Sequence, residues 1–174
     1  DAEDLAAFLA AKPADVAVTV IGVGSNLLVR DGGVPGVVIR LGRTFAAITA
    51  QGDVLETGAA ALDLNVALAA CTEGLGGLEF LSGIPGTVGG ALRMNAGAYG
   101  GEMKDVVLQA QVLDAAGQIR TVNAAGLGFG YRRCGVPETS IFLAARLQGR
   151  RADPHAISAR IEEIRRAREG SQPV

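Results

Sequence analysis

The sequence has no tryptophan, a single histidine and two cysteines, and aromatic residues make up only 4% of its 174 positions. Nucleic-acid bases stack on aromatic side chains, so this scarcity argues against a nucleic-acid partner. A net charge of −2 gives no electrostatic case for nucleic acid or for an anionic membrane. No apolar run reaches the 18 residues that a membrane-spanning helix needs. We therefore expect neither a nucleic-acid partner nor a membrane partner.

The shortage of histidine and cysteine also limits the chemistry of the chain. His155 alone cannot complete a metal site, and the two cysteines lack metal-ligand spacing, so no metal is expected. His155 lies in a charged segment, and no Ser/His/Asp arrangement exists. A redox cofactor that brings its own chemistry fits better than acid–base catalysis. Cys71 and Cys134 are expected to be free thiols in a reducing cytosol, which predicts a cytoplasmic protein.

Glycine, in contrast, is abundant, with 25 residues. One glycine-rich turn spans residues 22–26 between two apolar runs, and a longer glycine-rich segment spans residues 83–100. Glycine lets the backbone approach a ligand closely, because it has no β-carbon to hold the ligand away. Either segment alone could be a tight turn of the fold. Together they favour a long, phosphate-bearing cofactor.

Apolar periodicity and turn residues predict an α+β fold rather than a doubly wound parallel sheet. Helices are expected over residues 2–11, 62–71 and 154–169. Strands are expected over residues 16–21, 27–29, 37–41, 45–50, 54–57, 106–114, 118–122 and 141–147. No regular structure is expected in the glycine-rich segment 83–101. The 22–26 turn leads into a strand pattern, so we expect loop amides, not a helix dipole, to hold phosphate.

A few polar residues in these segments could contact a ligand. Ser25 and Asn26 could bind phosphate oxygens, or could simply close the turn. Pro85 fixes the backbone of the second segment, and Thr87 offers a hydroxyl there. Asn95 could bind the edge of a ring, or could tie two loops together.

Two tyrosines and an arginine lie in glycine-flanked loops. They are Tyr99, Tyr131 and Arg132. The planar guanidinium of Arg132 suits a carboxylate or a phosphate, although a surface salt bridge is the alternative.

Four motifs carry a resemblance to a known family. They are Val23-Gly24-Ser25-Asn26-Leu27-Leu28-Val29, the stretch from Gly77 to Gly90, Met94-Asn95-Ala96-Gly97-Ala98-Tyr99-Gly100, and Phe129-Gly130-Tyr131-Arg132. In their order and spacing, over nearly all of the chain, they resemble the UDP-N-acetylenolpyruvoylglucosamine reductases, the MurB enzymes. The wider class is similar to flavoproteins of the vanillyl-alcohol-oxidase type.

The resemblance implies a two-lobed FAD-binding domain of the vanillyl-alcohol-oxidase/MurB (PCMH-like) type. The first lobe would cover residues 1–75, without its opening strand, and the second would cover residues 76–174. A third, substrate-binding domain would follow the Ser171–Pro173 stretch. That domain would carry a proton-donating serine and a late glutamate, so we expect this chain alone to be inactive.

The resemblance also assigns roles to residues. Those that would bind FAD are Gly22, Gly24, Ser25, Asn26, Pro85, Gly86, Thr87, Gly90, Asn95 and Gly97. Those that would face the UDP-sugar enolpyruvate substrate are Tyr99, Tyr131 and Arg132, and Arg132 would also act in catalysis on the carboxylate. NADPH would supply the hydride, and the product, UDP-N-acetylmuramate, would serve peptidoglycan synthesis. At Gly90 some relatives have a serine, so that contact would come here from the backbone or from Thr87.

Two other functions stay open. The chain could be part of another flavoenzyme of the same fold, such as an oxidase of small alcohols or acids, or a non-catalytic flavin-binding module. The sequence leaves oligomeric state and the choice between NADPH and NADH undetermined.

Overall fold

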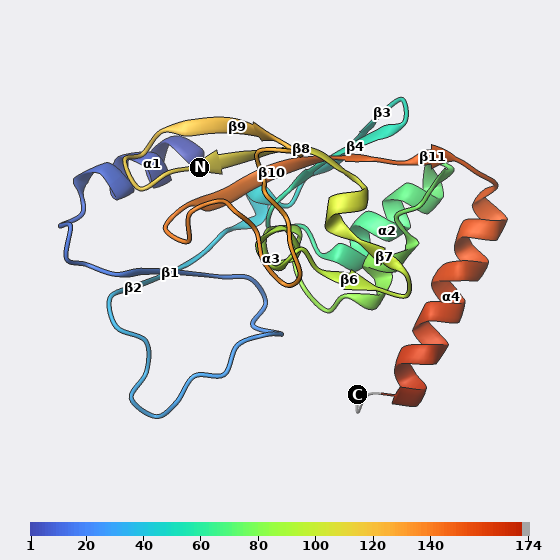
Figure 1. The fold of residues 1–174 in the computed structure, drawn as a ribbon, viewed down its shortest axis with the longest axis horizontal. Coiled ribbons are helices and arrows are strands. Elements are labelled where there is room, and N and C mark those ends of the chain that lie inside the picture. Colours follow the sequence, from blue (N-terminus) through green and yellow to red (C-terminus); the bar gives the residue numbers. More distant parts are fainter. Residues whose placement is uncertain (172–174) are drawn as a thin grey trace.

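The computed structural model describes residues 1–171, shown as a ribbon in Figure 1. The helices are α1 (Ala2–Ala11), α2 (Asp63–Thr72), α3 (Val88–Met94) and α4 (Pro154–Ser171). Short 3₁₀ helices are η1 (Arg43–Phe45), η2 (Glu79–Gly83) and η3 (Met103–Asp105). The strands are β1 (Val18–Ile21), β2 (Val37–Arg40), β3 (Ile48–Gln51), β4 (Val54–Gly58), β5 (Leu75–Gly76), β6 (Gly97–Ala98), β7 (Gly101–Glu102), β8 (Val107–Leu113), β9 (Ile119–Asn123), β10 (Ile141–Gln148) and β11 (Arg150–Arg151).

The main sheet is antiparallel, with strand order β3-β4-β10-β8-β9. Both predicted hairpins are confirmed as β3–β4 and β8–β9, and β10 lies between them. In the register, Gly58 of β4 lies opposite Ala144 of β10. The sheet therefore joins strands from both sides of the boundary expected between residues 75 and 76. Strand pairing does not divide the chain there, and the division into two lobes at that point stays a prediction.

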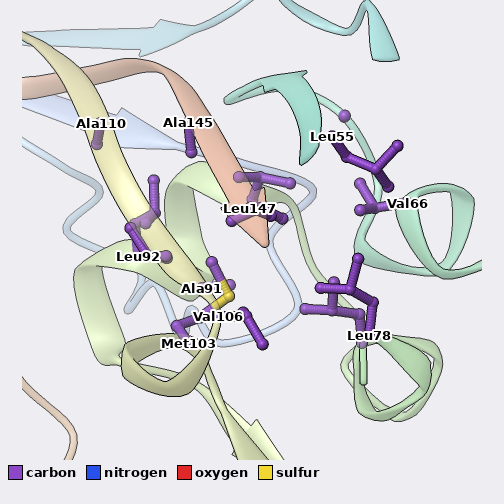
Figure 2. Close-up of a cluster of buried hydrophobic side chains, with 14 of the residues drawn as sticks. Leu55, Val66, Leu78, Ala91, Leu92, Met103, Val106, Ala110, Ala145 and Leu147 are labelled. Carbon is purple, nitrogen blue, oxygen red and sulfur yellow. The ribbon is translucent and has the colours of Figure 1, made fainter. Parts of the chain in front are cut away.

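One face of the main sheet packs on α2 and α3, and this layer forms the larger core (Figure 2). Leu55 of β4 and Leu147 of β10 point from the sheet, while Val66 of α2 and Leu92 of α3 point from the helices, and all four are fully buried. Burial of each such side chain contributes about 1.5–3 kcal/mol. The core thus fixes α2, and it also fixes α3, which lies within the second glycine-rich segment.

The beginning of β10 is buried on both faces. Ile141 and Leu143 pack with Leu9 of α1, whereas Phe142 belongs to the larger core on the opposite face. Alternate residues of a strand point to opposite faces, so three consecutive buried residues require cover on both sides. Helix α1, which the sequence predicted over the same residues, supplies that second layer, and it starts from a capping box made by Asp1 and Asp4.

Strands β1 and β2 form a separate parallel pair. The sequence predicted β1 as a buried strand, yet Val20 is 41% exposed. The predicted strand at 27–29 is wrong: these residues belong to the long irregular segment between β1 and β2 in Figure 1, and Leu28 is 91% exposed. A strand requires a hydrogen-bonded partner, and within the described part of the chain this segment pairs with none.

Two helical predictions need correction. The helix expected over residues 62–71 is α2, which begins at Asp63. The apolar pattern places Leu62, Val66, Leu68 and Ala69 on one face, and of these Val66 is buried, whereas Leu62 and Leu68 are exposed. The glycine-rich segment was expected to be irregular throughout, whereas its middle forms α3. Its low helix propensity is outweighed by the burial of Val88, Ala91 and Leu92, which is a tertiary effect.

Helix α4 runs beside α2 and η2 at one end of the molecule (Figure 1). It buries Ile157 and Ile164, and its solvent-exposed side carries ion pairs, such as Glu162 with Arg166 at 2.8 Å. Of the Ser171–Pro173 stretch, Gln172 and Pro173 lie outside the described residues. None of the helices in residues 1–171 combines the length and apolar character required to cross a membrane.

Candidate functional site

The two glycine-rich segments meet in space. A β-carbon built on Gly22 would lie 2.6 Å from the Thr87 hydroxyl oxygen, which is closer than real β-carbons come. Gly22 follows β1, and Thr87 precedes the first residue of α3. The contact is possible only because Gly22 has no side chain. The turn at residues 22–26 and the segment that leads into α3 are therefore adjacent.

An open cleft of about 380 Å³ lies where these segments meet, within the usual range for small-molecule sites. Val23 and Ser25 line it from the first turn, and Leu62 and Leu64 line it from the start of α2. The second segment adds Ser82, Ile84, Pro85 and Gly86, and α4 adds Arg168. The lining is mostly apolar, with hydroxyl groups and backbone between, which suits a ligand with a ring system and a polar chain.

The turn that follows β1 is exposed, and Gly24 is the residue of the turn that has a positive φ. Gly24 has φ +81°, and no heavy atom lies within 4 Å of its β-carbon position. Its backbone angle, not crowding, therefore requires glycine there. Ser25 and Asn26 are exposed at the mouth of the turn, and the Leu27 N–H donates to the Gly24 carbonyl at 3.3 Å. The side chains of Ser25 and Asn26 are thus accessible to a ligand, and their roles in binding one stay predictions.

The start of α3 is fixed to the end of β4. The Val88 N–H donates to the Ala61 carbonyl at 2.9 Å, and the Gly89 N–H donates to the Ala59 carbonyl at 2.8 Å. These two amides are thus used inside the fold. This arrangement is consistent with the expectation that phosphate is held by the exposed turn rather than by a helix terminus. A β-carbon on Gly90 would come no closer than 3.8 Å to Thr87, so the site has room for the serine of some relatives.

Asn95 ties three parts of the fold together. It ends α3 in the left-handed conformation, with φ 42°, and is 5% exposed. Its amide nitrogen donates to Glu102 Oε2 at 2.7 Å and to the Gly130 carbonyl at 3.2 Å, and its oxygen accepts from the Lys104 N–H at 2.9 Å. Both amide hydrogens are therefore used inside the protein. This geometry favours the role of Asn95 as a tie between loops. The geometry does not support direct contact of Asn95 with a flavin, and that contact stays a prediction.

The loop that Asn95 holds presents two of the predicted substrate residues. Gly130 and Arg133 exchange backbone hydrogen bonds of 3.0 and 3.2 Å, so Tyr131 and Arg132 occupy the tip of a tight turn. Tyr131 is 90% exposed, and Arg132 is exposed with φ 53°. Both side chains therefore extend into solvent, free to meet a ligand.

Tyr99 and Gly97 lie on the β6–β7 side. The Tyr99 ring packs against Gly83, and its backbone carbonyl accepts from Arg160 of α4 at 3.3 Å. Gly97 packs against Glu102 across the β6–β7 pair. Among the described residues, the cleft lining includes Ser25, Pro85 and Gly86 from the predicted set. The other predicted residues are not part of that lining: Gly22, Gly24, Asn26, Thr87, Gly90, Asn95, Gly97, Tyr99, Tyr131 and Arg132.

Sequence reasoning missed Asp63, the first residue of α2. Its side chain is fully buried, and neither carboxyl oxygen has a hydrogen-bond partner in the described structure. Burial raises the pKa of Asp63 to about 8, because it disfavours the charged form. An acidic residue at the start of a helix ordinarily faces solvent, so nothing in the sequence separates this one from a surface residue. Within residues 1–171, no cluster of His, Cys, Asp and Glu could hold a metal ion.

Comparison with known proteins identifies relatives that match the whole chain. The chain is 61% identical over its whole length to the UDP-N-acetylenolpyruvoylglucosamine reductase of Paramagnetospirillum magneticum and 60% identical to that of Rhodospirillum rubrum. It spans 57% and 54% of the length of these two proteins. The resemblance that the four motifs indicated is thereby confirmed.

Solved structures confirm the fold class. The structure of UDP-N-acetylenolpyruvylglucosamine reductase (MurB) from Thermus caldophilus superposes with a TM-score of 0.83 at 36% identity, covering the whole chain and 62% of that protein. Quinoline 2-oxidoreductase from Pseudomonas putida 86 shares the fold, with a TM-score of 0.63 at 17% identity over 84% of this chain and 55% of that one. The FAD binding domain family matches residues 1–123. The chain belongs to the FAD-binding domain family.

Proposed function

We propose that this chain is the FAD-binding part of a UDP-N-acetylenolpyruvoylglucosamine reductase. The whole protein would reduce UDP-N-acetylglucosamine enolpyruvate to UDP-N-acetylmuramate with NADPH, in the cytoplasm, for peptidoglycan synthesis. The names of the similar proteins support this proposal. The observation that carries it is the close approach of Gly22 and Thr87 beside the cleft, which joins the two glycine-rich segments of the resemblance.

The residues around the cleft fit a dinucleotide. The positions that a β-carbon would occupy on Gly22 and Gly86 lie against Thr87 and Asp63, so these glycines let the segments that border the cleft pack closely together. The exposed turn of Gly24, Ser25 and Asn26 offers backbone and side-chain donors suited to a pyrophosphate. The apolar side chains of the lining would pack against a ring.

Each group of residues would then have one task. The turn at residues 22–26 would bind the pyrophosphate, and Pro85, Gly86 and Thr87 would contact the rest of the cofactor. When bound, FAD would supply hydride transfer from NADPH to the enolpyruvyl double bond. Arg132 would bind the enolpyruvyl carboxylate through its bidentate fork and stabilise the charge that develops there. Tyr99 and Tyr131 would border the substrate.

The test is made on the full-length protein that contains this chain. The cofactor is released and identified by mass, and turnover of the enolpyruvate substrate is measured with NADPH. We expect one FAD per protein and NADPH-dependent formation of UDP-N-acetylmuramate. FMN, or no flavin in well-folded protein, would contradict the cofactor assignment. Bound FAD without turnover of this substrate would instead favour another flavoenzyme of the same fold.

A further inference from the structure

Arg93 is an arginine near the end of α3 that the proposed mechanism does not use. Its half-buried guanidinium donates through Nη1 to the Val136 carbonyl at 2.7 Å and to the Pro137 carbonyl at 3.2 Å. Through Nη2 it donates to the Ser140 carbonyl at 2.7 Å. The three hydrogen bonds of this guanidinium therefore go to the backbone of one short segment, residues 136–140.

This segment belongs to the connection between β9 and β10, residues 124–140, whose tight turn carries Arg132. Asn95, which directly follows α3, donates to the Gly130 carbonyl before that turn at 3.2 Å, whereas Arg93 bonds to the chain after it. The end of α3 therefore holds the connection on both sides of Arg132.

The surroundings of the guanidinium make its contacts hard to replace. Val136 and Ser140 are both buried, so their carbonyls would be poorly solvated if the guanidinium were removed. Arg93 Cζ also lies 5.0 Å from the centroid of the Phe142 ring, close enough for the cation and the ring to attract each other. The planar fork of arginine reaches carbonyls of separate residues at once, whereas lysine offers one compact ammonium group. Arginine is therefore well suited to fix this segment to α3.

The place of Arg132 depends on these backbone contacts. Arg132 is exposed with φ 53°, and its side chain forms no hydrogen bond or ion pair with residues 1–171. The backbone of the turn therefore directs its guanidinium, and the contacts with Arg93 and Asn95 fix where the turn lies. The other end of α3 follows Thr87, which adjoins Gly22. Helix α3 has seven residues and rises about 10 Å, so one short helix connects the cofactor segment with the Arg132 turn.

We propose that Arg93 is a positioning residue for the reaction with substrate: by binding the backbone of residues 136–140, it holds the Arg132 turn at a fixed place relative to the cofactor segment at the start of α3. This inference rests on the proposed function, because it takes Arg132 as the group that binds the substrate carboxylate. It goes beyond that function, since it assigns to Arg93 an action through Arg132. A displacement of about 1 Å between reacting groups can cost about a hundredfold in rate, so the loss should fall on the step that needs Arg132.

The test uses the full-length protein loaded with FAD. Arg93→Met removes the donors but keeps an unbranched side chain, and it should slow reoxidation of the flavin by the enolpyruvate substrate about tenfold or more. The Kd for FAD and the rate of flavin reduction by NADPH should stay close to those of wild type. Arg93→Lys, which keeps the charge and a donor, should restore part of the rate. The matched control is Arg151→Met, because Arg151 also donates to two backbone carbonyls, those of Gly52 at 3.1 Å and Glu73 at 3.2 Å, but at β11. This control should leave reoxidation unchanged.

A double variant and hydrogen exchange separate positioning from a general loss of stability. If Arg93 acts through Arg132, adding Arg93→Met to Arg132→Ala should slow reoxidation little further. Amides of residues 130–136 should exchange faster in Arg93→Met than in wild type, because the turn is released. Fully additive losses, unchanged reoxidation in Arg93→Met or weaker FAD binding in that variant would overturn the inference, and Arg93→Lys carries the same comparison if Arg93→Met does not fold. Unchanged reoxidation in Arg132→Ala itself would contradict the proposed role of Arg132, and the inference with it, which separates the two failures.

Discussion

The α-carbon of Gly22 faces the hydroxyl of Thr87 so closely that a β-carbon on Gly22 would lie 2.6 Å from Thr87 Oγ1. Thr87 is 6% exposed, and the segment that follows it is held to the end of β4 by the Val88 and Gly89 amides. Thr87 therefore cannot move freely to make room. This single contact sets the distance between the exposed turn at residues 22–26 and the wall of the cleft formed by Pro85 and Gly86.

Gly22→Ala should separate the two segments and raise the Kd for FAD by about tenfold or more, because a contact of 2.6 Å requires a shift of the backbone. In Thr87→Ala the nearest remaining atom would be the β-carbon, at 3.6 Å, which is ordinary contact. The double variant Gly22→Ala/Thr87→Ala should therefore bind FAD about as well as Thr87→Ala alone. The double variant Gly22→Ala/Thr87→Val keeps the volume of the side chain at position 87 and should show no such rescue. Flavin fluorescence titration measures all four variants, and additive losses in the double variant would show that the contact does not set the site.

Gly24→Val should weaken FAD binding for a different reason. Space around Gly24 is open, so the expected effect comes from its φ of +81°, which costs a non-glycine residue roughly 1–2 kcal/mol and a β-branched residue more. Gly24→Asn should bind better than Gly24→Val, because asparagine tolerates left-handed angles. Circular dichroism checks folding alongside the titration. Equal affinity in wild type and Gly24→Val would make the turn structural only.

The sequence was sufficient for most elements of the fold because they depend on local patterns. Both hairpins, α1, α4 and the extent of α2 follow from turn residues and periodicity. The failures occur where tertiary contacts decide. The apolar run at 27–29 has no strand beside it, and the glycine-rich α3 is stabilised by burial rather than by propensity.

The site could be predicted only in part for the same reason. Motifs indicated Gly22, Gly86 and Thr87, but only the structure shows that they adjoin. Asn95 looked equally suited to a ligand and to a tie between loops, and its hydrogen bonds to distant residues favour the tie. Asp63 has no pattern that separates it from an exposed helix-start residue, since its burial is created by the neighbouring segment at Gly86.

Asp63 should make the stability of the apo protein depend on pH. Its pKa is about 8 in the folded state against an ordinary value of 3.8, so between these values the folded state keeps a proton that the unfolded state releases. The free energy of unfolding should then fall as pH rises from about 4 to about 8, by at most about 1.4 kcal/mol per pH unit, and level off above that. Asp63→Asn cannot ionise, so its stability relative to wild type should increase over this range. Urea unfolding of both proteins at pH 5 and pH 8 provides the test, and parallel profiles would contradict it.

Arg132→Ala in the full-length protein should impair reoxidation of the flavin by substrate far more than reduction of the flavin by NADPH. The lost contact strengthens in the transition state, so the expected loss in that half-reaction is roughly 2–4 kcal/mol. Arg132→Lys should restore activity only in part, because a point charge does not replace the bidentate fork. Stopped-flow absorbance follows the two half-reactions separately. Equal loss in both would assign Arg132 to the fold or to the flavin.

The most direct test of the account is a crystal structure of the full-length protein with FAD. The cofactor should occupy the cleft between the two glycine-rich segments, with its pyrophosphate against the backbone of residues 22–26 and part of its chain against Gly86. Electron density for FAD elsewhere on the molecule, with the cleft between Ser25 and Gly86 empty, would contradict the central claim that these segments together form the cofactor site.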